Sequence, residues 1–175
     1  MKRTRAALCS AMLSLLEEKA FEDISIRDIT ERAQIGYATF FRNYQSNRAV
    51  LRDLIEDQIR QVIELTVPAV ERTRGRAAAL ALCSFVDEHR NLWSALLTGG
   101  AAGIVREEFT RQGAQVRSTL TRRAWLPVEL ANIFAVSAIV EILTWWLQRG
   151  PGLTVEEIAQ ILDRLVISSF VRERT

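Results

Sequence analysis

The side chains able to perform catalysis or bind a metal ion are few in this sequence, and their spacing is unfavourable. His89 is the only histidine, and no cysteine, histidine or carboxylate follows it at three or four residues, the spacing of one helical face. Asp87 and Glu88 precede it directly, and consecutive residues of a helix point in different directions. We therefore expect no metal site, no cofactor and no catalytic centre, so the protein is not predicted to be an enzyme.

Two cysteines, Cys9 and Cys83, are the only thiols. This low number fits a reducing compartment, and we expect both to be small buried side chains rather than redox sensors. The apolar stretch at residues 6–16 is interrupted by serines and followed by Glu17 and Glu18, so we expect no export signal. The prediction that follows is a cytoplasmic location.

Charge is unevenly divided along the chain. The 175 residues are 49% hydrophobic and 25% charged, and the net charge is only +2. Residues 1–50 contain eight Lys and Arg against six Asp and Glu, whereas residues 51–175 contain fifteen of each. In the first fifty, Lys2, Arg3 and Arg5 form a short basic arm before the first predicted helix, and Arg27, Arg42 and Arg48 follow. Basic residues gathered at one end of a protein are typical of a surface that meets nucleic acid.

The spacing of apolar residues predicts an all-α protein of about nine helices. The chain has only three prolines and eight glycines, and we find no sustained alternation typical of a strand. Ser25 with Asp28, and Thr154 with Glu157, have the spacing of a capping box, in which each side chain bonds the backbone N–H of the other residue. The expected helices are at about 6–19, 25–33, 37–44, 46–68, 76–88, 91–97, 104–124, 127–149 and 154–172.

The strongest local signal lies between residues 25 and 44. Two short helices are separated by about four residues; Ile29 and Ala33 lie on one inner face, and Ile35, Phe40 and Tyr44 lie on the other. These dimensions are those of a helix-turn-helix, whose second, recognition helix enters the DNA major groove. The alternative is a helical hairpin without a role in DNA binding, because periodicity alone would permit it.

A resemblance to a known family lies in residues 25–51, which read SIRDITERAQIGYATFFRNYQSNRAVL. This segment resembles the amino-terminal domain of the TetR family of one-component transcriptional regulators, and the match covers about residues 6–55. The remainder resembles the ligand-binding and dimerisation half of the family in helix number and length. The resemblance implies a three-helix helix-turn-helix DNA-binding domain at residues 1–50 and a helical ligand-binding and dimerisation domain at residues 51–175.

The same resemblance assigns the DNA contacts. Residues 37–44 would be the recognition helix, whose amino end reaches base edges and attracts phosphate. Arg42 can read guanine or hold phosphate. Ser25 and Arg27 before this helix, and Arg48 after it, would fix the protein on the DNA backbone. The predicted DNA-binding residues are Arg3, Arg5, Ser25, Arg27, Tyr37, Ala38, Thr39, Arg42, Asn43, Asn47 and Arg48.

Four positions depart from the family pattern. Gln34 stands where the turn usually has glycine, and Gly36 stands where it has a polar cap. Either the bend is shifted or Gln34 is held at positive φ at a cost of about 1 kcal/mol. Phe41 and Asn47 replace a tyrosine and a lysine that contact phosphate in the family, which weakens two anchors. The residues expected to compensate are Tyr37, Arg42 and Arg48.

The second half contains a helix that must be covered on nearly all sides. Residues 133–147 include twelve apolar residues in fifteen, interrupted only by Ser137, Glu141 and Thr144. One chain has too few helices to cover it, so we expect a partner chain to pack against it. The final predicted helix has a matching apolar stripe, and two such helices from each subunit predict a homodimer with a four-helix interface. A membrane span is the competing interpretation, but Glu141 would cost about 3 kcal/mol inside it, and we expect no membrane contact.

Aromatic residues of the second half suggest an effector pocket. By the resemblance they fall on helices that surround the effector in the family, although aromatic residues at helical spacing more often pack a core. Glu141 is either paired with an arginine or at the rim of the dimer interface, or it is a counter-charge for a cationic ligand. The predicted pocket residues are Phe85, His89, Trp93, Leu97, Phe109, Phe134, Glu141 and Trp145.

Together these patterns predict a dimeric DNA-binding transcriptional regulator. We expect a repressor that a small, largely apolar effector releases from a near-palindromic double-stranded DNA operator. The alternative is a helical homodimer that binds a small molecule or a protein partner without binding DNA.

Overall fold

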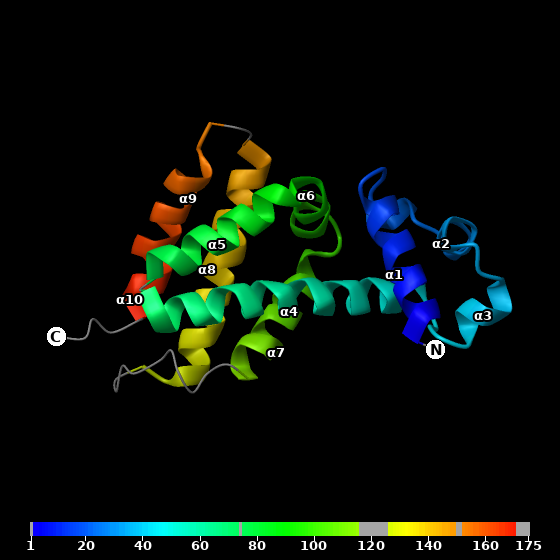
Figure 1. Ribbon diagram of the computed structural model, residues 1–175, viewed down its shortest axis with the longest axis horizontal. Helices are drawn as coiled ribbons and strands as arrows, with labels where there is room; N and C mark the ends of the chain where they lie inside the picture. The colour runs from blue at the N-terminus through cyan, green and yellow to red at the C-terminus, as the bar shows by residue number, and fades with distance from the viewer. Residues whose placement is uncertain (1, 74, 116–125, 150–151, 171–175) are drawn as a thin grey trace.

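The protein consists of two groups of helices joined by one long helix. The computed structural model describes residues 2–73, 75–115, 126–149 and 152–170. The first group contains α1 (Lys2–Leu16), the short 3-10 helix η1 (Phe21–Asp23), α2 (Ile26–Ala33) and α3 (Tyr37–Phe41). The long helix α4 (Asn47–Thr73) runs from this group into the second. Figure 1 shows α1, α2 and α3 at one end of the molecule, α4 running away from them, and α5, α8, α9 and α10 toward the other end.

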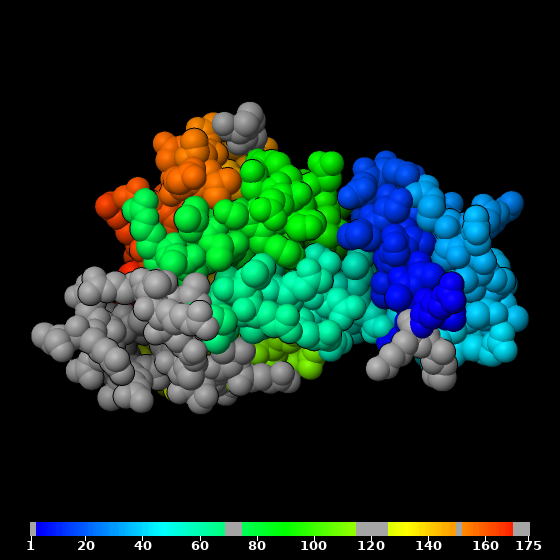
Figure 2. Space-filling view, in the orientation of Figure 1, coloured from blue at the N-terminus to red at the C-terminus, as the bar shows by residue number. Residues whose placement is uncertain are grey.

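The second group is a bundle around α4 and α8. Its helices are α5 (Gly75–Glu88), α6 (Arg90–Thr98), α7 (Ala102–Gln115), α8 (Val128–Arg149), α9 (Val155–Leu162), the π-helix η2 (Asp163–Ile167) and α10 (Ser168–Phe170). α4 packs along α5, α9 lies on α5, and α8 lies against α6 and α7. Figure 2 shows α4 and α5 side by side on the viewed face. The all-α prediction is confirmed for the part of the chain that the structure describes.

Each of the nine expected helices is present, with shifted ends. The predicted continuation of the seventh helix through residues 116–124, and the end of the last one at 171–172, lie outside the described residues. The last predicted helix is found as the succession of α9, η2 and α10. Both predicted capping boxes are present, one at Ser25 with Asp28 and the other at Thr154 with Glu157.

The predicted basic arm is wrong, because α1 already begins at Lys2. Lysine and arginine are good helix formers, so nothing in this stretch prevents helix formation. Arg5 also forms an ion pair with Asp53 of α4, which holds the first turn against the rest of the protein. Arg3 and Arg5 therefore extend from the first turn of α1 rather than from a segment that precedes it.

α3 ends at Phe41, three residues earlier than predicted, and the reason lies in Asn43. Its side-chain Nδ2 donates to the backbone oxygen of Thr39 at 2.7 Å. The backbone N–H of Asn43 bonds the oxygen of Phe40 at 2.8 Å instead, which is a tighter i to i−3 contact. An asparagine side chain that competes for a backbone acceptor in this way favours a helix end.

α4 continues past Pro68 to Thr73, whereas the sequence predicted its end near the proline. A proline inside a helix removes one backbone hydrogen bond and normally kinks or ends the helix. Here Thr66 reinforces the preceding turn, because its hydroxyl donates to the oxygen of Val62 at 2.8 Å. The packing of α4 along α5 supplies further stabilisation that a local pattern does not contain.

α8 is the apolar helix for which the sequence predicted cover by other helices and by a partner chain rather than a membrane span. By length and composition it is able to cross a membrane, with a mean hydropathy of 1.7 over a window of which 33% is buried. In the structure it contributes buried residues to the bundle, among them Val140, Leu143 and Trp146. Its Glu141 pairs with Arg106 of α7 at 2.6 Å. These contacts are those of a helix in a packed bundle.

The cysteines lie on the packed sides of their helices, but to different degrees. Cys83 is fully buried in α5, and burial raises the pKa of its thiol to about 12. Cys9 in α1 is half-buried, and burial also raises the pKa of its thiol. A raised pKa keeps a thiol protonated and unreactive at neutral pH.

Candidate nucleic-acid interface

The start of α2 is fixed by the predicted capping box. The Ser25 hydroxyl accepts the N–H of Asp28 at 3.1 Å, and the Asp28 carboxylate accepts the N–H of Ser25 at 2.8 Å. Lys19 of the segment after α1 reaches the same carboxylate at 2.9 Å. The bonds from Ser25 and the charge of Lys19 hold the pKa of Asp28 well below its usual range. The box therefore sets both where α2 begins and how it meets α1.

The turn between α2 and α3 decides between the two expectations for Gln34. Gln34 has a φ of 53°, the left-handed conformation, so the bend stays in its usual place and the strain falls on this residue. Its N–H bonds the oxygen of Glu31 at 3.2 Å, and Ile35 N–H bonds the oxygen of Thr30 at 2.9 Å. Gly36 then precedes α3 without a side-chain cap.

α3 has one buried face and one exposed face, as a recognition helix requires. Phe40 is fully buried, and Tyr44 just beyond the helix is 5% exposed, which confirms their predicted inward packing. Tyr37 and Phe41 are both about half exposed, and their ring centroids lie 5.8 Å apart. The exposed side chains of α3 and of the following residue are Tyr37, Ala38, Phe41 and Arg42.

Two of the predicted DNA-contacting residues, both asparagines, have their amides engaged inside the protein. Asn43 donates to Thr39 as described above, and its Oδ1 is buried without a partner among the described residues. Asn47 donates through Nδ2 to the oxygen of Ile24 at 2.8 Å, and its Oδ1 accepts the N–H of Arg48 at 2.8 Å. Asn47 thus joins the start of α4 to the segment before α2.

The predicted cationic contacts fall into two groups. Arg27 forms an exposed ion pair with Glu31 at 2.7 Å, and Arg5 pairs with Asp53. Arg42 donates to the hydroxyl of Thr39 at 2.8 Å, which leaves its charge uncompensated. Among the described residues, the predicted DNA-contacting arginines without an acidic partner are Arg3, Arg42 and Arg48.

A polar cluster that local sequence patterns did not reveal holds this end of the molecule together. The Tyr44 hydroxyl donates to Asp53 at 2.6 Å and receives Nε of Arg5 at 3.3 Å. The sulfur of Cys9 lies 3.5 Å from the same hydroxyl. Burial and the bond to Asp53 raise the pKa of Tyr44. The sequence separation of 48 residues between Arg5 and Asp53 gave no signal for this contact.

A shallow hollow lies where the turn meets α3. It is open to solvent, and two predicted DNA contacts, Arg27 and Tyr37, line it together with the strained Gln34. Its remaining lining residues are Thr30, Glu31, Ile35 and Gly36. The hollow belongs to the same exposed side of the helix-turn-helix as α3.

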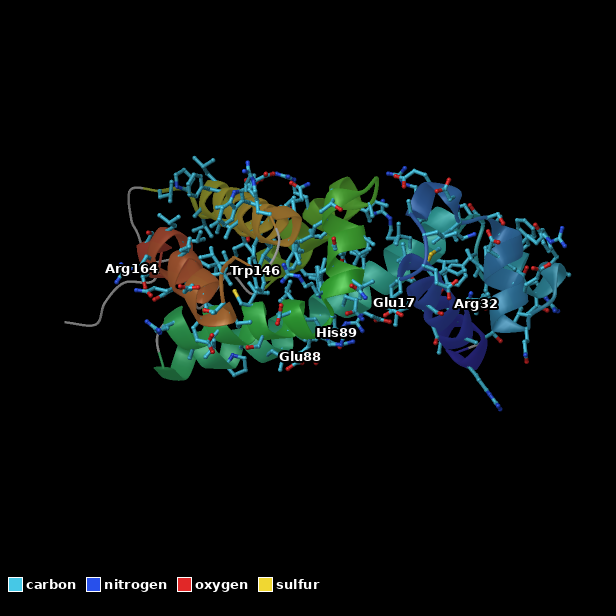
Figure 3. All side chains as sticks on the ribbon, turned by 90° about the horizontal axis from the view of Figure 1, so that it is seen from above. Glu17, Arg32, Glu88, His89, Trp146 and Arg164 are labelled. Atoms are coloured by element: carbon cyan, nitrogen blue, oxygen red, sulfur yellow. The ribbon has the colours of Figure 1, made fainter. Side chains whose placement is uncertain are left out.

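The predicted effector residues lie at the other end of the molecule, and four of them form a chain of ring contacts. The ring of Phe85 lies 4.7 Å from that of His89 and 6.3 Å from that of Trp93, which lies 6.1 Å from Phe109. Leu97 is buried nearby in α6. Nε1 of Trp93 is buried without a hydrogen-bond partner among the described residues. Figure 3 labels His89 in this group and Arg32 in the helix-turn-helix group.

Three other predicted pocket residues, Phe134, Glu141 and Trp145, are exposed on α8. Phe134 is 56% exposed and Trp145 is 45% exposed. The Glu141 carboxylate is exposed and accepts a hydrogen bond from Arg106 at 2.6 Å. These three side chains are exposed whereas Trp93 is buried, and Glu141 has an arginine partner, which was one of its interpretations.

His89 and its neighbours show the geometry of a helix junction. Its Nδ1 lies 2.9 Å from the oxygen of Phe85, and the residue caps the start of α6. No group of three or more His, Cys, Asp or Glu side chains within the described ranges is arranged to hold a metal ion.

A buried polar bridge between α4 and α7 was also missed. Glu108 is 3% exposed and accepts Nε2 of Gln112 at 2.7 Å and Nε of Arg111 at 2.9 Å. Gln112 also donates to the backbone oxygen of Glu56 in α4 at 3.0 Å. The sequence does not distinguish Glu108 from exposed Glu107, because the two are adjacent and chemically identical.

Comparison with known proteins supplies the classification. No family model matches the chain. An uncharacterised HTH-type transcriptional regulator of Mycobacterium tuberculosis is 28% identical over 168 residues, which is 93% of this chain and 78% of the relative. A TetR transcriptional regulator from Streptococcus agalactiae superposes with a TM-score of 0.68 at 22% identity, covering 95% of this chain and 94% of that one. The chain has the TetR-family fold.

A second solved structure supports the same assignment of the TetR fold. A TetR-family regulator from Streptomyces coelicolor has a TM-score of 0.64 at 18% identity, covering 93% of this chain and 78% of that one. The resemblance seen in residues 25–51 is therefore confirmed over the fold of nearly the whole chain. These relatives and neighbours are named as transcriptional regulators, the class of protein that the sequence predicted.

Proposed function

We propose that this protein is a TetR-family regulator that binds a double-stranded DNA operator as a homodimer and acts as a repressor released by a small effector. The observation that carries the proposal is the exposed face of α3, where Tyr37, Ala38 and Arg42 stand on a helix anchored from behind by buried Phe40. A recognition helix needs this division between an anchored face and an exposed face. The helical homodimer without DNA binding is the alternative to be tested.

The proposed DNA contacts are mainly to phosphate. Arg3, Arg42 and Arg48 have no acidic partner among the described residues, so each is available to replace a counterion on DNA. Three phosphate contacts per subunit make six per dimer and predict a log–log slope of affinity against salt of about −5; with Arg42 on a base, two per subunit remain and predict about −4. Ser25, Arg27, Tyr37 and Thr39 are proposed to position the protein on the backbone or on base edges.

The proposed dimer interface is the exposed side of α8. Leu130, Ile133 and Trp145 are each about half exposed, and Leu165 of η2 is 62% exposed. An apolar surface of this kind on a helix is typical of an intersubunit contact. A twofold dimer presents two α3 helices to a near-palindromic operator, with half-sites about one DNA turn apart or somewhat wider.

The dimer is tested by sedimentation of the full chain. Trp145→Glu is expected to lower the apparent mass toward that of a monomer, since it places a charge on the proposed interface. Leu80→Glu is the matched control, because Leu80 is an exposed apolar residue of α5, a helix that packs mainly on α4 and α9. A Trp145→Glu protein that remains dimeric would contradict the assignment of this face.

The proposed effector site is the aromatic chain formed by Phe85, His89, Trp93 and Phe109. Its side chains are largely apolar, so the ligand class is a small, mostly apolar molecule. Binding there would favour a spacing of the two α3 helices that no longer fits adjacent half-sites, so operator affinity would fall. Titration of the protein–operator complex with the apolar dye 1-anilinonaphthalene-8-sulfonate tests whether occupancy of an apolar site releases DNA.

The proposal also assigns location and domain roles. A DNA-binding regulator acts where the DNA is, so we propose a cytoplasmic protein with α8 in the bundle and the dimer interface rather than in a membrane. The DNA-binding unit is residues 1–50 and the effector and dimer unit is residues 51–175, so the division falls inside α4. One continuous helix would then carry movement from the second unit to the first.

The decisive experiment is selection of bound sequences from a random pool of double-stranded DNA. The expected result is enrichment of a near-palindrome, followed by a salt slope of about −4 to −5 on the selected site. Recovery of no preferred sequence together with a flat salt response would favour the homodimer without DNA binding. Expression of a reporter from a promoter that contains the selected site then tells repressor from activator.

A further inference from the structure

We infer that Arg42 reads a guanine base in each operator half-site and that Thr39 positions it for this contact. The inference rests on the proposed DNA binding and adds the base and the residue that recognises it. It also assigns Asn43 and Asn47, whose residue types are suited to base or phosphate contacts, to the internal structure of the helix-turn-helix.

The first argument is the direction of the Arg42 side chain. Arg42 caps the end of α3, yet its Nη2 donates to the hydroxyl of Thr39 at 2.8 Å, almost one turn earlier. The guanidinium is therefore drawn back along α3 toward the amino-terminal part of the helix. In helix-turn-helix proteins that part of the recognition helix contacts base edges. Thr39 is half-buried, so its hydroxyl provides a fixed point for the arginine.

The second argument is the set of donors that remain free. A guanidinium has five N–H groups. In Arg42 only Nη2 donates a hydrogen bond among the described residues, to the hydroxyl of Thr39. No carboxylate pairs with Arg42 in the described part of the chain, whereas Arg27 is held by Glu31. A planar fork with two free donors matches the O6 and N7 acceptors of guanine in the major groove.

The third argument is the absence of a competing reader on the exposed face of α3. Ala38, one turn before Arg42, has only a methyl group, and Tyr37 and Phe41 present rings. Asn43 would suit adenine, but its Nδ2 is bound to Thr39 and its Oδ1 is buried. Among the exposed side chains of α3 and its carboxy-terminal cap, Arg42 is thus the one able to form a bidentate contact with a base.

The test compares sequence selection by the 175-residue chain and four variants. The wild type is expected to select a guanine at one position of each half-site. Arg42→Ala should abolish that preference, with an about 10- to 100-fold lower affinity for the selected site and a smaller decrease for sites that lack the guanine. Arg42→Lys keeps the charge but not the fork, so it should also abolish most of the preference. Thr39→Val should weaken the guanine preference and leave the salt slope unchanged.

Arg48→Ala is the matched control, because Arg48 is also exposed and has no acidic partner among the described residues. It should weaken binding to all sequences alike and make the salt slope shallower by about 1 for each phosphate that the protein no longer neutralises. Selection of the same guanine by Arg42→Ala would overturn the assignment of Arg42, and an unchanged preference in Thr39→Val would overturn the role of Thr39. Failure of the wild type to select any DNA would instead overturn the proposed function. Circular dichroism confirms that each variant is folded.

Discussion

Tyr44 donates its phenolic hydrogen to the carboxylate of Asp53 at 2.6 Å, and this bond connects the segment after α3 to α4. Arg5 of α1 bonds both partners, with Nε 3.3 Å from the Tyr44 oxygen and 3.1 Å from Asp53. Its guanidinium also lies over the Tyr44 ring, 5.2 Å from the centroid. The position of α3 against the long helix is therefore set by polar contacts as well as by the packing of Phe40.

Replacing Tyr44 with phenylalanine tests the stabilising role of this bond. The change removes the hydroxyl and keeps the packing of the ring, so partly buried Asp53 loses a hydrogen-bond donor. We expect the free energy of unfolding in urea to fall by about 1–2 kcal/mol. Tyr37→Phe is the control, because the exposed Tyr37 ring should tolerate the same change within about 0.5 kcal/mol. Equal effects of the two changes would argue against a special role for Tyr44.

The capping box at Ser25 predicts a dependence of stability on acid pH. The pKa of Asp28 is depressed in the folded protein by its bonds to Ser25 and by Lys19, so the folded state favours the carboxylate. The stabilisation is therefore fully present above the ordinary aspartate pKa of about 4 and is lost as the pH falls toward the lower, folded value. Asp28→Asn has no carboxylate to titrate at this position.

The measurement is the unfolding midpoint of wild type and Asp28→Asn between about pH 6 and pH 2. The wild type should be the more stable protein at pH 6, and the difference should shrink as the pH falls below about 4. A difference in stability between the two proteins that stays constant from about pH 6 to pH 2 would contradict this explanation.

Adjacent glutamates on α7 offer a direct comparison of buried and exposed charge. Glu108 is buried and bonded to Gln112 and Arg111, whereas the Glu107 side chain is 67% exposed and pairs with Arg52 at 3.3 Å. Glu108→Ala leaves buried donors with fewer acceptors, and we expect the unfolding free energy to fall by about 1–3 kcal/mol.

Glu107→Ala, the internal control for this pair, should cost less than about 1 kcal/mol, because exposed ion pairs contribute little. The measurement is chemical denaturation of both variants under identical conditions. A similar decrease in the two would mean that the polar bridge between α4 and α7 contributes no more than a surface contact.

Local sequence patterns predicted the parts of the fold that depend on neighbouring residues. The capping box of Ser25 with Asp28 is a contact over three residues, and the inward packing of Phe40 and Tyr44 follows from helical periodicity. The αL conformation of Gln34 was one of two expectations, because the turn geometry requires a positive φ there. Each of these features is decided within about one helical turn of sequence.

Long-range contacts and side-chain directions were the features that the sequence could not supply. The bond of Arg5 to Asp53 joins residues 48 apart, and the same arginine was expected in a DNA-binding arm. The amide of Asn43 turns toward Thr39 rather than toward solvent, a choice between rotamers that residue type does not determine. Phe134 and Trp145 are apolar residues of an apolar helix. Only the packing of α8 in the structure shows that their side chains are exposed.

Gln34 provides a prediction in which a substitution stabilises the protein. Its φ of 53° is unfavourable for any side chain with a Cβ, while glycine adopts this region freely. Gln34→Gly should therefore raise the free energy of unfolding by about 0.5–1 kcal/mol, the relief of strain being partly offset by the greater entropy of glycine in the unfolded chain. Gln34→Ala keeps the Cβ and should give no such gain, so comparison of the two by urea denaturation isolates the backbone effect. If alanine stabilised as much as glycine, the gain would come from the removal of the glutamine side chain and not from the left-handed backbone.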